Sequence, residues 1–475
     1  MPKRRLLVLA LAGIVLVLVP TGCEFPGPAV TVTFTSPSNN QRIIGSRTLP
    51  VTGLISGTDP SAFSLTLNGS AVNLALPTAG TFSTSVTLKD GANTLVATAT
   101  ASGETSSATL DLYYPYLALG NGQDASTVVG QATFGTANAG TTISTLSSPV
   151  GAPALVGGNL YIPDTANNRV VGMAGVPSFN GASFSILLGQ TSWTTSDPGT
   201  LLDRSFSTPS SVTGTADQLI IADPGHNRVL IYGGVPTVLN TPARSAVGQS
   251  SLTATRNTSC DAVHLADPQA AFVTPTGRLV VADTGHHRVL IWNSIPEVSG
   301  TPADGVLGQT DLTSCLPNRG GSASKSTLSG PRDVWSDGTR LAVADTGNNR
   351  VLIWTSFPTA KGAPADVLID QGTIVPGPGQ PTVIGLSAPR GVGSNGNQLF
   401  LSDTGHHRIL GFDLEPSINL TPTIVLGQAD FSGTAANRSG STAANTLSGP
   451  QGVRVFDGML MVADTGNTRE LIYRP

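Results

Sequence analysis

A polar six-residue motif returns six times at nearly constant spacing, and this repetition limits the fold more than any other feature. The motif reads Asp, any residue, Gly or Ala, Asn or His, any residue, Arg, and its copies follow one another after 58 to 62 residues. A proline lies 14 or 15 residues before each aspartate, and a Gly-Gln pair precedes five of these six prolines. The motif aspartates and arginines are Asp164, Asp223, Asp283, Asp345, Asp403 and Asp464, with Arg169, Arg228, Arg288, Arg350, Arg408 and Arg469.

Each repeat unit contains four candidate strands. One follows the proline, one ends at the aspartate, one starts at the arginine and one ends at Gly-Gln. Four strands repeated six times is the pattern of a six-bladed β-propeller. A charged fraction of only 11%, with 55 Gly and 34 Pro, agrees with many short strands joined by tight turns. We therefore predict an all-β chain whose residues 117–475 form a six-bladed propeller.

Three units, at residues 331–354, 389–412 and 450–473, share a longer pattern that runs from the proline to an aromatic residue after Arg-Val-Leu-Ile or a similar run. This pattern resembles NHL repeats, although the units here are longer because of the segment around Gly-Gln. Because the repeated residues are structural and no asymmetric catalytic set accompanies them, we expect a non-catalytic binding or scaffold module. The resemblance implies a six-bladed propeller. The alternative that it leaves open is a metal-dependent lyase or hydrolase with its site in the central channel.

The order of the markers also predicts how the ring closes. A Gly-Gln segment at residues 126–131 precedes the first proline, Pro149, whereas the last unit has only three strands before Pro475. Pairing the early segment with the last unit would remove two exposed strand edges. We therefore expect residues 126–131 to supply the outer strand of the last blade.

The first residues have the features of an export signal, because three basic residues precede an apolar run at 6–19. The run is too short to span a bilayer. Its Gly-Cys end resembles the signals of bacterial lipoproteins, which implies that residues 1–22 are removed, that Cys23 is lipidated and that 23–29 form a tether. Glu24 after that cysteine argues for the outer membrane in this family; a secreted or periplasmic location is the alternative. We expect membrane contact through the lipid anchor only.

Residues 30–116 alternate apolar and polar positions in short runs separated by turn signals such as Asn68-Gly69 and Asp90-Gly91. This period of two indicates an antiparallel β-sandwich. The stretch 81–95 resembles bacterial Ig-like domains, which implies that this region is a spacer.

Charge and cysteine content limit the partners. A formal net charge of −4 without a basic excess argues against a nucleic-acid surface. Besides Cys23 the chain has only Cys260 and Cys315, which in an oxidising compartment often pair. Two unpaired thiols are the alternative.

The repeated motif itself predicts structure rather than chemistry. Asp and Asn accept backbone N–H groups in tight turns, and the arginine can return to the carboxylate across the turn. Histidine occupies the fourth position in three copies, at His226, His286 and His406. If these imidazoles converged they could hold a divalent cation; otherwise they are turn residues. No cofactor is predicted beyond that alternative.

Ligand binding is expected on the innermost strands, where the blades differ. The candidates there are Gln269, Arg332, Arg390, Gln451 and Arg454. The arginines could form a positive lining for a carboxylate or sulfate group; the alternative is that they form local salt bridges or face solvent. No catalytic residue is predicted, because no nucleophile elbow, zinc motif, phosphate loop or close carboxylate pair occurs. We expect a protein or polysaccharide as partner, and no nucleic acid.

Overall fold

The computed structural model describes residues 29–199, 203–254, 256–370, 372–377, 385–414, 417–456 and 458–475. The chain divides into two compact units, one formed by residues 114–475 with 42–46 and the other by 47–113 with the segment that ends at Gln41. The expected signal peptide, Cys23 and all but the last residue of the tether lie outside the described residues. No helix within the described ranges is long and apolar enough to cross a membrane.

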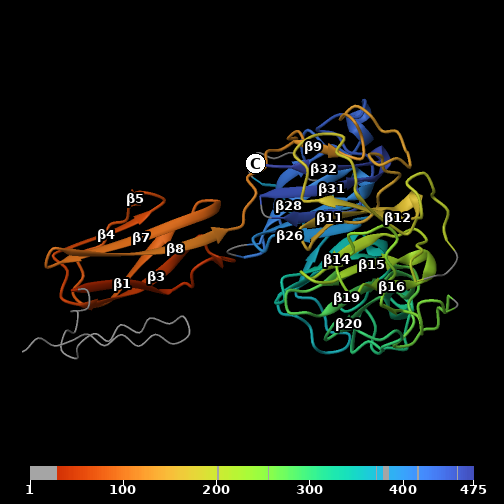
Figure 1. Cartoon of the computed structure of the whole chain (residues 1–475). Helices are drawn as coiled ribbons and strands as arrows, with labels where there is room; N and C mark the ends of the chain where they lie inside the picture. The colour runs from red at the N-terminus through yellow and green to blue at the C-terminus, as the bar shows by residue number, and fades with distance from the viewer. Residues whose placement is uncertain are drawn as a thin grey trace, which may run out of the picture. The chain divides into compact units, whose positions relative to one another are not determined.

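The first unit consists of two antiparallel sheets (Figure 1, red and orange). Buried and exposed residues alternate along its longer strands, as the period of two in the sequence predicts. The three-stranded sheet contains β1 (Val30–Ser36), β3 (Thr48–Gly57) and β6 (Gly80–Thr87). The five-stranded sheet contains β2 (Gln41–Arg42), β8 (Glu104–Tyr114), β7 (Gly91–Ala101), β4 (Ala62–Leu67) and β5 (Ser70–Ala71).

The second unit contains six four-stranded antiparallel sheets, which are the six blades of the predicted propeller (Figure 1). Blade 1 contains β10 (Ala154–Val156), β11 (Asn159–Asp164), β12 (Arg169–Ala174) and β13 (Ile186–Leu188). Blade 2 contains β14 (Ser211–Gly214), β15 (Leu219–Asp223), β16 (Arg228–Ile231) and β17 (Ser245–Val247). Blade 3 contains β18 (Pro268–Val273), β19 (Leu279–Asp283), β20 (Arg288–Trp292) and β21 (Gly305–Leu307).

Blades 4 and 5 repeat the same order, and blade 6 takes its fourth strand from elsewhere in the chain. Blade 4 contains β22 (Pro331–Ser336), β23 (Leu341–Asp345), β24 (Arg350–Trp354) and β25 (Val367–Ile369). Blade 5 contains β26 (Gly391–Ser394), β27 (Gln398–Asp403), β28 (Arg408–Asp413) and β29 (Pro422–Leu426). Blade 6 contains β30 (Val453–Phe456), β31 (Met459–Asp464), β32 (Arg469–Tyr473) and β9 (Thr127–Val129).

The strand that closes the ring is β9. It pairs antiparallel with β32, with Val129 opposite Glu470 and Thr127 opposite Ile472. The pairing predicted from the marker order is therefore present, over three residues rather than the whole of 126–131. The side chain of Gln131 extends the junction, because its Nε2 donates to the carbonyl oxygen of Thr468 at 3.1 Å.

Every repeated motif forms one turn of 3-10 helix between the second and third strands of its blade. The residue after each of these turns has a left-handed backbone, with φ between 49° and 53°. The turns are η1 (Thr165–Asn167), η2 (Pro224–His226), η3 (Thr284–His286), η5 (Thr346–Asn348), η6 (Thr404–His406) and η8 (Thr465–Asn467). Two further turns, η4 (Pro317–Gly320) and η7 (Ala436–Ser439), lie in the loops before blades 4 and 6.

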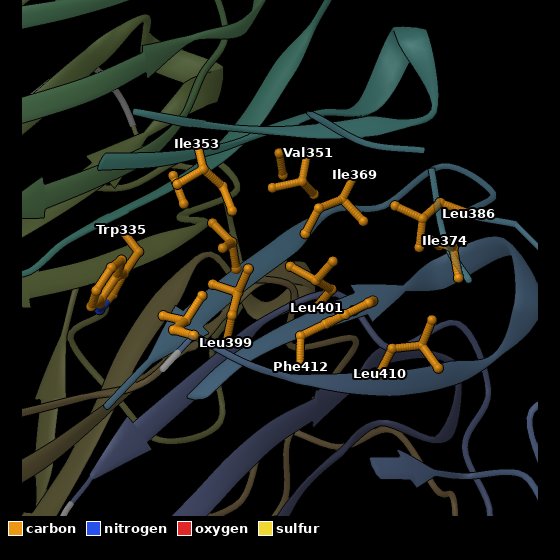
Figure 2. Packing of buried hydrophobic residues seen from close by; sticks show 14 of the residues in the cluster. Trp335, Val351, Ile353, Ile369, Ile374, Leu386, Leu399, Leu401, Leu410 and Phe412 are labelled. Atoms are coloured by element: carbon orange, nitrogen blue, oxygen red, sulfur yellow. The ribbon is translucent and has the colours of Figure 1, made fainter. Parts of the chain in front are cut away.

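The hydrophobic core lies between neighbouring blades. Figure 2 shows the cluster between blades 4 and 5, where Val351 and Ile353 of one blade pack with Leu399, Leu401 and Phe412 of the next. An aromatic residue at the end of the third strand packs in this way against the preceding blade in five blades, at Tyr232, Trp292, Trp354, Phe412 and Tyr473. The aromatic positions therefore join the blades.

Candidate functional site

The polar groups of the repeated motif bind one another within each blade. In all six copies the arginine Nε donates to one carboxylate oxygen of the aspartate, at 2.6–2.9 Å. The Asn or His at the fourth position binds the same oxygen at 2.7–3.0 Å. The other oxygen accepts a backbone N–H from the loop just before the proline, at 2.6–2.8 Å. The aspartate thus fixes the turn and the loop beside it.

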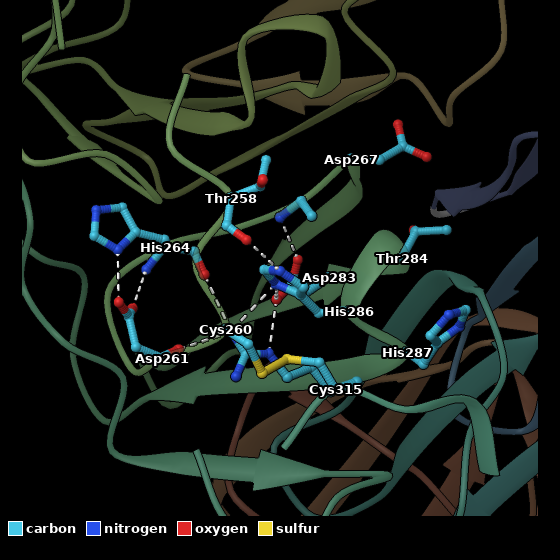
Figure 3. Close-up of polar contacts among 12 residues, drawn as sticks. Thr258, Cys260, Asp261, His264, Asp267, Asp283, Thr284, His286, His287 and Cys315 are labelled. Carbon is cyan, nitrogen blue, oxygen red and sulfur yellow. Dashed lines mark hydrogen bonds and ion pairs between the residues drawn. A yellow bond between two sulfur atoms is a disulfide. The ribbon is translucent and has the colours of Figure 1, made fainter. Parts of the chain in front are cut away.

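The motif arginine also holds the two long loops that flank its blade. For blade 3, Figure 3 labels Asp261, Asp283 and His286 in the surroundings of this arginine. Arg288 Nη1 donates to the carbonyl oxygen of Leu312 at 2.6 Å, and its Nη2 donates to that of Asp261 at 2.8 Å. In blade 6, burial raises the pKa of Asp464 and the facing Arg469 opposes the rise. A buried charge that is fully hydrogen-bonded in this way serves to hold the structure in place, in agreement with the structural role predicted for the motif.

The second position of the motif links five of the six blades to the next blade. In five copies this residue is a threonine whose hydroxyl donates to the carbonyl oxygen of the following blade's proline. The pairs are Thr165–Pro209, Thr284–Pro331, Thr346–Pro389, Thr404–Pro450 and Thr465–Pro149. Blade 2 has Pro224 at this position, which carries no hydroxyl. The last of the five bonds joins blade 6 to blade 1 and so contributes to closure.

The fifth position of the motif also contacts the next blade, a role that the sequence analysis did not assign. Its side chain accepts a hydrogen bond from the backbone N–H just before the next proline. Asn168 Oδ1 accepts from Thr208 at 2.8 Å, and His287 Nδ1 accepts from Gly330 at 3.0 Å. The signal available in the sequence was that Asn or His occupies this position in five of six copies.

The three histidines that were candidate metal ligands lie in three different blades. His226, His286 and His406 each bind the aspartate of their own turn through Nδ1. Within the described ranges no three His, Cys, Asp or Glu side chains are grouped so that they could share a metal ion. The structure therefore does not bring these histidines together, and it places them as turn residues.

Cys260 and Cys315 form a disulfide, with their Cα atoms 6.1 Å apart (Figure 3). Cys260 belongs to the loop before blade 3 and Cys315 to the loop before blade 4. In the first loop, His264 Nδ1 binds Asp261 at 2.8 Å, and the His264 backbone N–H donates to the same carboxylate. The disulfide therefore joins two ordered loops of neighbouring blades.

The residues that directly follow the six prolines surround one small cavity, which we call the channel mouth. Because all six blades contribute, the mouth lies where the inner strands converge. Four of the five predicted ligand-binding residues line it, and the fifth, Arg454, does not. The lining residues at this position are Val150, Ser210, Gln269, Arg332, Arg390 and Gln451, followed one step along the chain by Gly151, Ser211, Ala270, Asp333 and Gly452.

The mouth is narrow because the inner strands of blades 5, 6 and 1 approach closely. A methyl group on Gly391 would lie 2.1 Å from the carbonyl oxygen of Gln451, and one on Gly452 would lie 2.4 Å from the Ala152 nitrogen. The space open to the centre of a water molecule is about 20 Å³. A single water needs roughly 10–15 Å³ by that measure. The mouth therefore has room for a small group and not for a sugar ring.

Arginine is concentrated on one side of the mouth. Arg390 Nη1 donates to Gln451 Oε1 at 2.7 Å. Burial lowers the pKa of Arg390, and the positive charge of Arg332 lowers it further. Asp267, which the sequence analysis overlooked, lies near enough to Arg332 for the guanidinium to oppose the rise that burial causes in its pKa. The sequence sets Asp267 apart, because the other five blades carry Ser, Thr, Gly or Ala directly before the proline.

Arg454 and Asp333 form a second, buried layer. Arg454 extends from blade 6 until its guanidinium carbon lies 5.0 Å from the ring centre of Phe272 in blade 3. Asp333 of blade 4 accepts backbone N–H groups from Val334 at 2.8 Å and Val392 at 2.9 Å. Burial raises the pKa of Asp333 to about 6, and Arg454 opposes the rise. The arginine predicted to bind ligand is therefore a buried group that spans the centre of the ring.

Neither a protein-family model nor a curated protein sequence matches the chain. Several solved structures match the chain. A Bacteroides thetaiotaomicron auxiliary nutrient binding protein is 13% identical, with 94% of this chain and 97% of that chain covered and a TM-score of 0.39. A Bacteroides ovatus auxiliary nutrient binding protein is 10% identical at the same coverage, with a TM-score of 0.41. A B. thetaiotaomicron putative phosphatase is 12% identical at that coverage, also with a TM-score of 0.41. Likenesses of this size carry no conclusion about function.

Proposed function

We propose that the protein is an exported, lipid-anchored β-propeller that binds a protein or polysaccharide at the cell envelope without catalysing a reaction. The ligand contacts the propeller face on which the channel mouth opens. One observation carries the proposal: the repeated polar residues bind one another inside the blades, whereas the mouth gathers charged residues that differ from blade to blade. A site needs such asymmetry, because a ligand does not share the symmetry of the scaffold.

The loops around the mouth support binding on this face. They run from Gly-Gln to the proline that precedes each lining residue, and they differ in length and sequence, as at 191–207 and 429–447. Variable loops on a rigid scaffold are where binding specificity usually lies. The Cys260–Cys315 disulfide and the motif arginines hold several of these loops in place.

The chemistry of the mouth supports binding over acid–base catalysis. Asp333 is the carboxylate that lines the cavity, and both of its oxygens accept backbone N–H groups. Arginine does not release a proton at ordinary pH and cannot act as a general base. No observation of the described residues specifically favours the lyase or hydrolase alternative, which therefore stays a prediction from resemblance.

The test is a binding screen with the chain from residue 24 onward against envelope polysaccharides and surface proteins. Saturable binding without conversion of the ligand is expected. Turnover of a substrate that depends on a stoichiometric cation would contradict the proposal and favour the enzyme alternative. Metabolic labelling with a fatty acid tests the anchor: wild type is expected to take up label and Cys23→Ser is not.

A further inference from the structure

We propose that the channel mouth binds a small oxyanion, the carboxylate or sulfate group of an acidic ligand, between Arg332 and Arg390. The inference rests on the binding function proposed above and names the chemical group that the mouth takes.

Arg332 and Arg390 are neighbouring like charges, and Asp267 is a carboxylate near Arg332 that forms no ion pair with it. Arg332 forms no hydrogen bond or ion pair with any residue in the described ranges, and it lies close enough to lower the pKa of Arg390. Both side chains are half-buried at the mouth. Two neighbouring cations in a partly desolvated site repel each other, and a bound anion removes that repulsion.

The acids nearby are already engaged. Asp267 Oδ1 accepts a hydrogen bond from Gln269 Nε2 at 2.6 Å, and Asp333 accepts two backbone N–H groups. Neither acid lies within ion-pair distance of Arg332 or Arg390 among the described residues, although the charge of Arg332 acts on Asp267. Asp333 faces the buried Arg454 instead, which is the charge that opposes the rise in its pKa. The mouth therefore keeps an excess of positive charge.

A buried hydrogen-bond donor without an acceptor lies at the same place. Arg390 Nε is buried and has no acceptor among the described residues. The bond from Arg390 Nη1 to Gln451 Oε1 fixes the guanidinium at the mouth. A carboxylate or sulfate has only acceptors and matches such a set of donors in charge and geometry.

The size of the cavity decides how much of the ligand enters. A space of about 20 Å³ for water centres fits a charged group of a few atoms. On the side opposite the arginines the lining residues are the smaller Val150 and Ser210. The ligand is therefore expected to insert one charged group while its remainder contacts the surrounding loops.

Calorimetric titration of the mature chain with acetate, sulfate and phosphate tests the site. We expect saturable binding that weakens at least ~10-fold in Arg332→Gln and in Arg390→Gln, because each variant removes charge-assisted hydrogen bonds. The matched control is Arg244→Gln, since Arg244 pairs with Glu297 outside the mouth. Far-UV circular dichroism checks that each variant is folded. Equal affinity in all four chains, or no binding of any of the three anions by the folded wild type, would overturn the proposal.

Three sugars then distinguish the source of the charge. Galacturonate carries a carboxylate, galactose 6-sulfate a sulfate ester, and galactose neither. We expect at least one acidic sugar to bind and galactose not to bind. Binding of galactose as tightly as the acidic sugars overturns the oxyanion site but leaves the binding function standing. Oxyanion binding by a protein that retains no macromolecule in the screen supports the site and contradicts the proposed function.

Discussion

Among single residues, Glu470 departs most from the pattern that the other blades follow. It comes directly after the motif arginine, where the other five blades carry Val or Ile. Glu470 is fully buried between β31 and β9, and neither carboxylate oxygen has a hydrogen-bond partner among the described residues. Burial, and then the charge of Asp464, raise its pKa well above the ordinary value. The side chain is therefore a neutral acid in the folded protein at moderately acidic pH.

Replacing this acid should stabilise the protein. Because the folded-state pKa lies above the unfolded value of 4.5, the cost of burying Glu470 is smallest below pH 4.5, where the side chain is protonated in both states, and it grows as the pH rises toward the folded-state pKa. At pH 7.5 we expect Glu470→Val to raise the free energy of unfolding by about 1–3 kcal/mol, the usual cost of burying an unpaired polar group. Urea unfolding at pH 4.5 and 7.5 measures this. A gain that is no larger at pH 7.5 than at pH 4.5 would refute it.

His287 and His407 titrate in the opposite sense. Each accepts a backbone N–H through Nδ1, which requires that nitrogen to be unprotonated. Burial, and then the neighbouring histidine, lower the pKa of both. Their contribution to stability is therefore present above pH 6.5, the unfolded value, and is lost as the pH falls through the lowered folded-state pKa.

Asparagine should remove this acid sensitivity without removing the link, since Asn168 and Asn349 accept the same bond in other blades. We expect the melting temperature of the double variant His287→Asn/His407→Asn to fall less than that of wild type between pH 7.5 and pH 5. The reciprocal change Asn349→His should increase the fall. Identical pH profiles for the three proteins would show that these links do not titrate.

Among the contacts between blades, the hydrogen bonds donated by the motif threonine hydroxyls are the easiest to test by substitution. Thr346→Val keeps the shape of the side chain but leaves the Pro389 carbonyl oxygen without its donor at 2.6 Å. We expect a loss of about 1 kcal/mol in the free energy of unfolding, the typical value for one hydrogen bond. Thr465→Val should cost a similar amount at the seam between blades 6 and 1. Thermal unfolding that is unchanged in both variants would contradict the role assigned to this position.

Much of this element-level structure could be predicted, because the same geometry recurs six times. Each blade needs a turn of the same shape, so Asp, Gly and Arg recur at fixed spacing and reveal the strands beside them. The loops carry no such constraint. Two of them nevertheless share a turn that was not predicted: Asn318 and Arg319 have φ of 50° and 57°, and Asn437 and Arg438 have 49° and 53°.

The candidate site was predicted in part. The position after each proline could be assigned to the inner strand, and four candidates line the mouth accordingly. The depth of Arg454 could not be foreseen, because it depends on Gly393 beside it, where a Cβ would lie 3.3 Å from the Arg454 Cα, and on Phe272 across the ring. Such contacts join blades far apart in the sequence, and no spacing rule encodes them.

For the whole propeller, stability depends on the junction between β9 and β32, whose paired residues are 341 to 345 positions apart in the sequence. Without β9, the backbone N–H and C=O groups of β32 that it pairs would be exposed, and Leu471 would lose Val128 from the core cluster that the two residues share. The segment before β9 also contacts the residues after β32, because Gln123 Nε2 donates to the carbonyl oxygen of Arg474 at 2.7 Å. Ring closure is thus a local contact in space, although it is remote in sequence.

Moving the closing segment should test whether its place in the ring, rather than its place in the chain, determines stability. We expect deletion of residues 117–135 from the full chain to lower the melting temperature of the propeller sharply, because a buried strand and its half of the seam are lost. Appending the same residues after Pro475 through a short Gly-Ser linker should restore most of that loss, since the Gln123–Arg474 contact brings the new junction within reach.

The control appends a segment of equal length in which Val128 and Val129 are both replaced by Asp, which should not restore the melting temperature, because both valines are fully buried. Calorimetry of the three variants and of wild type measures the melting temperatures. A deletion variant that melts like wild type would show that β9 does not hold the ring closed.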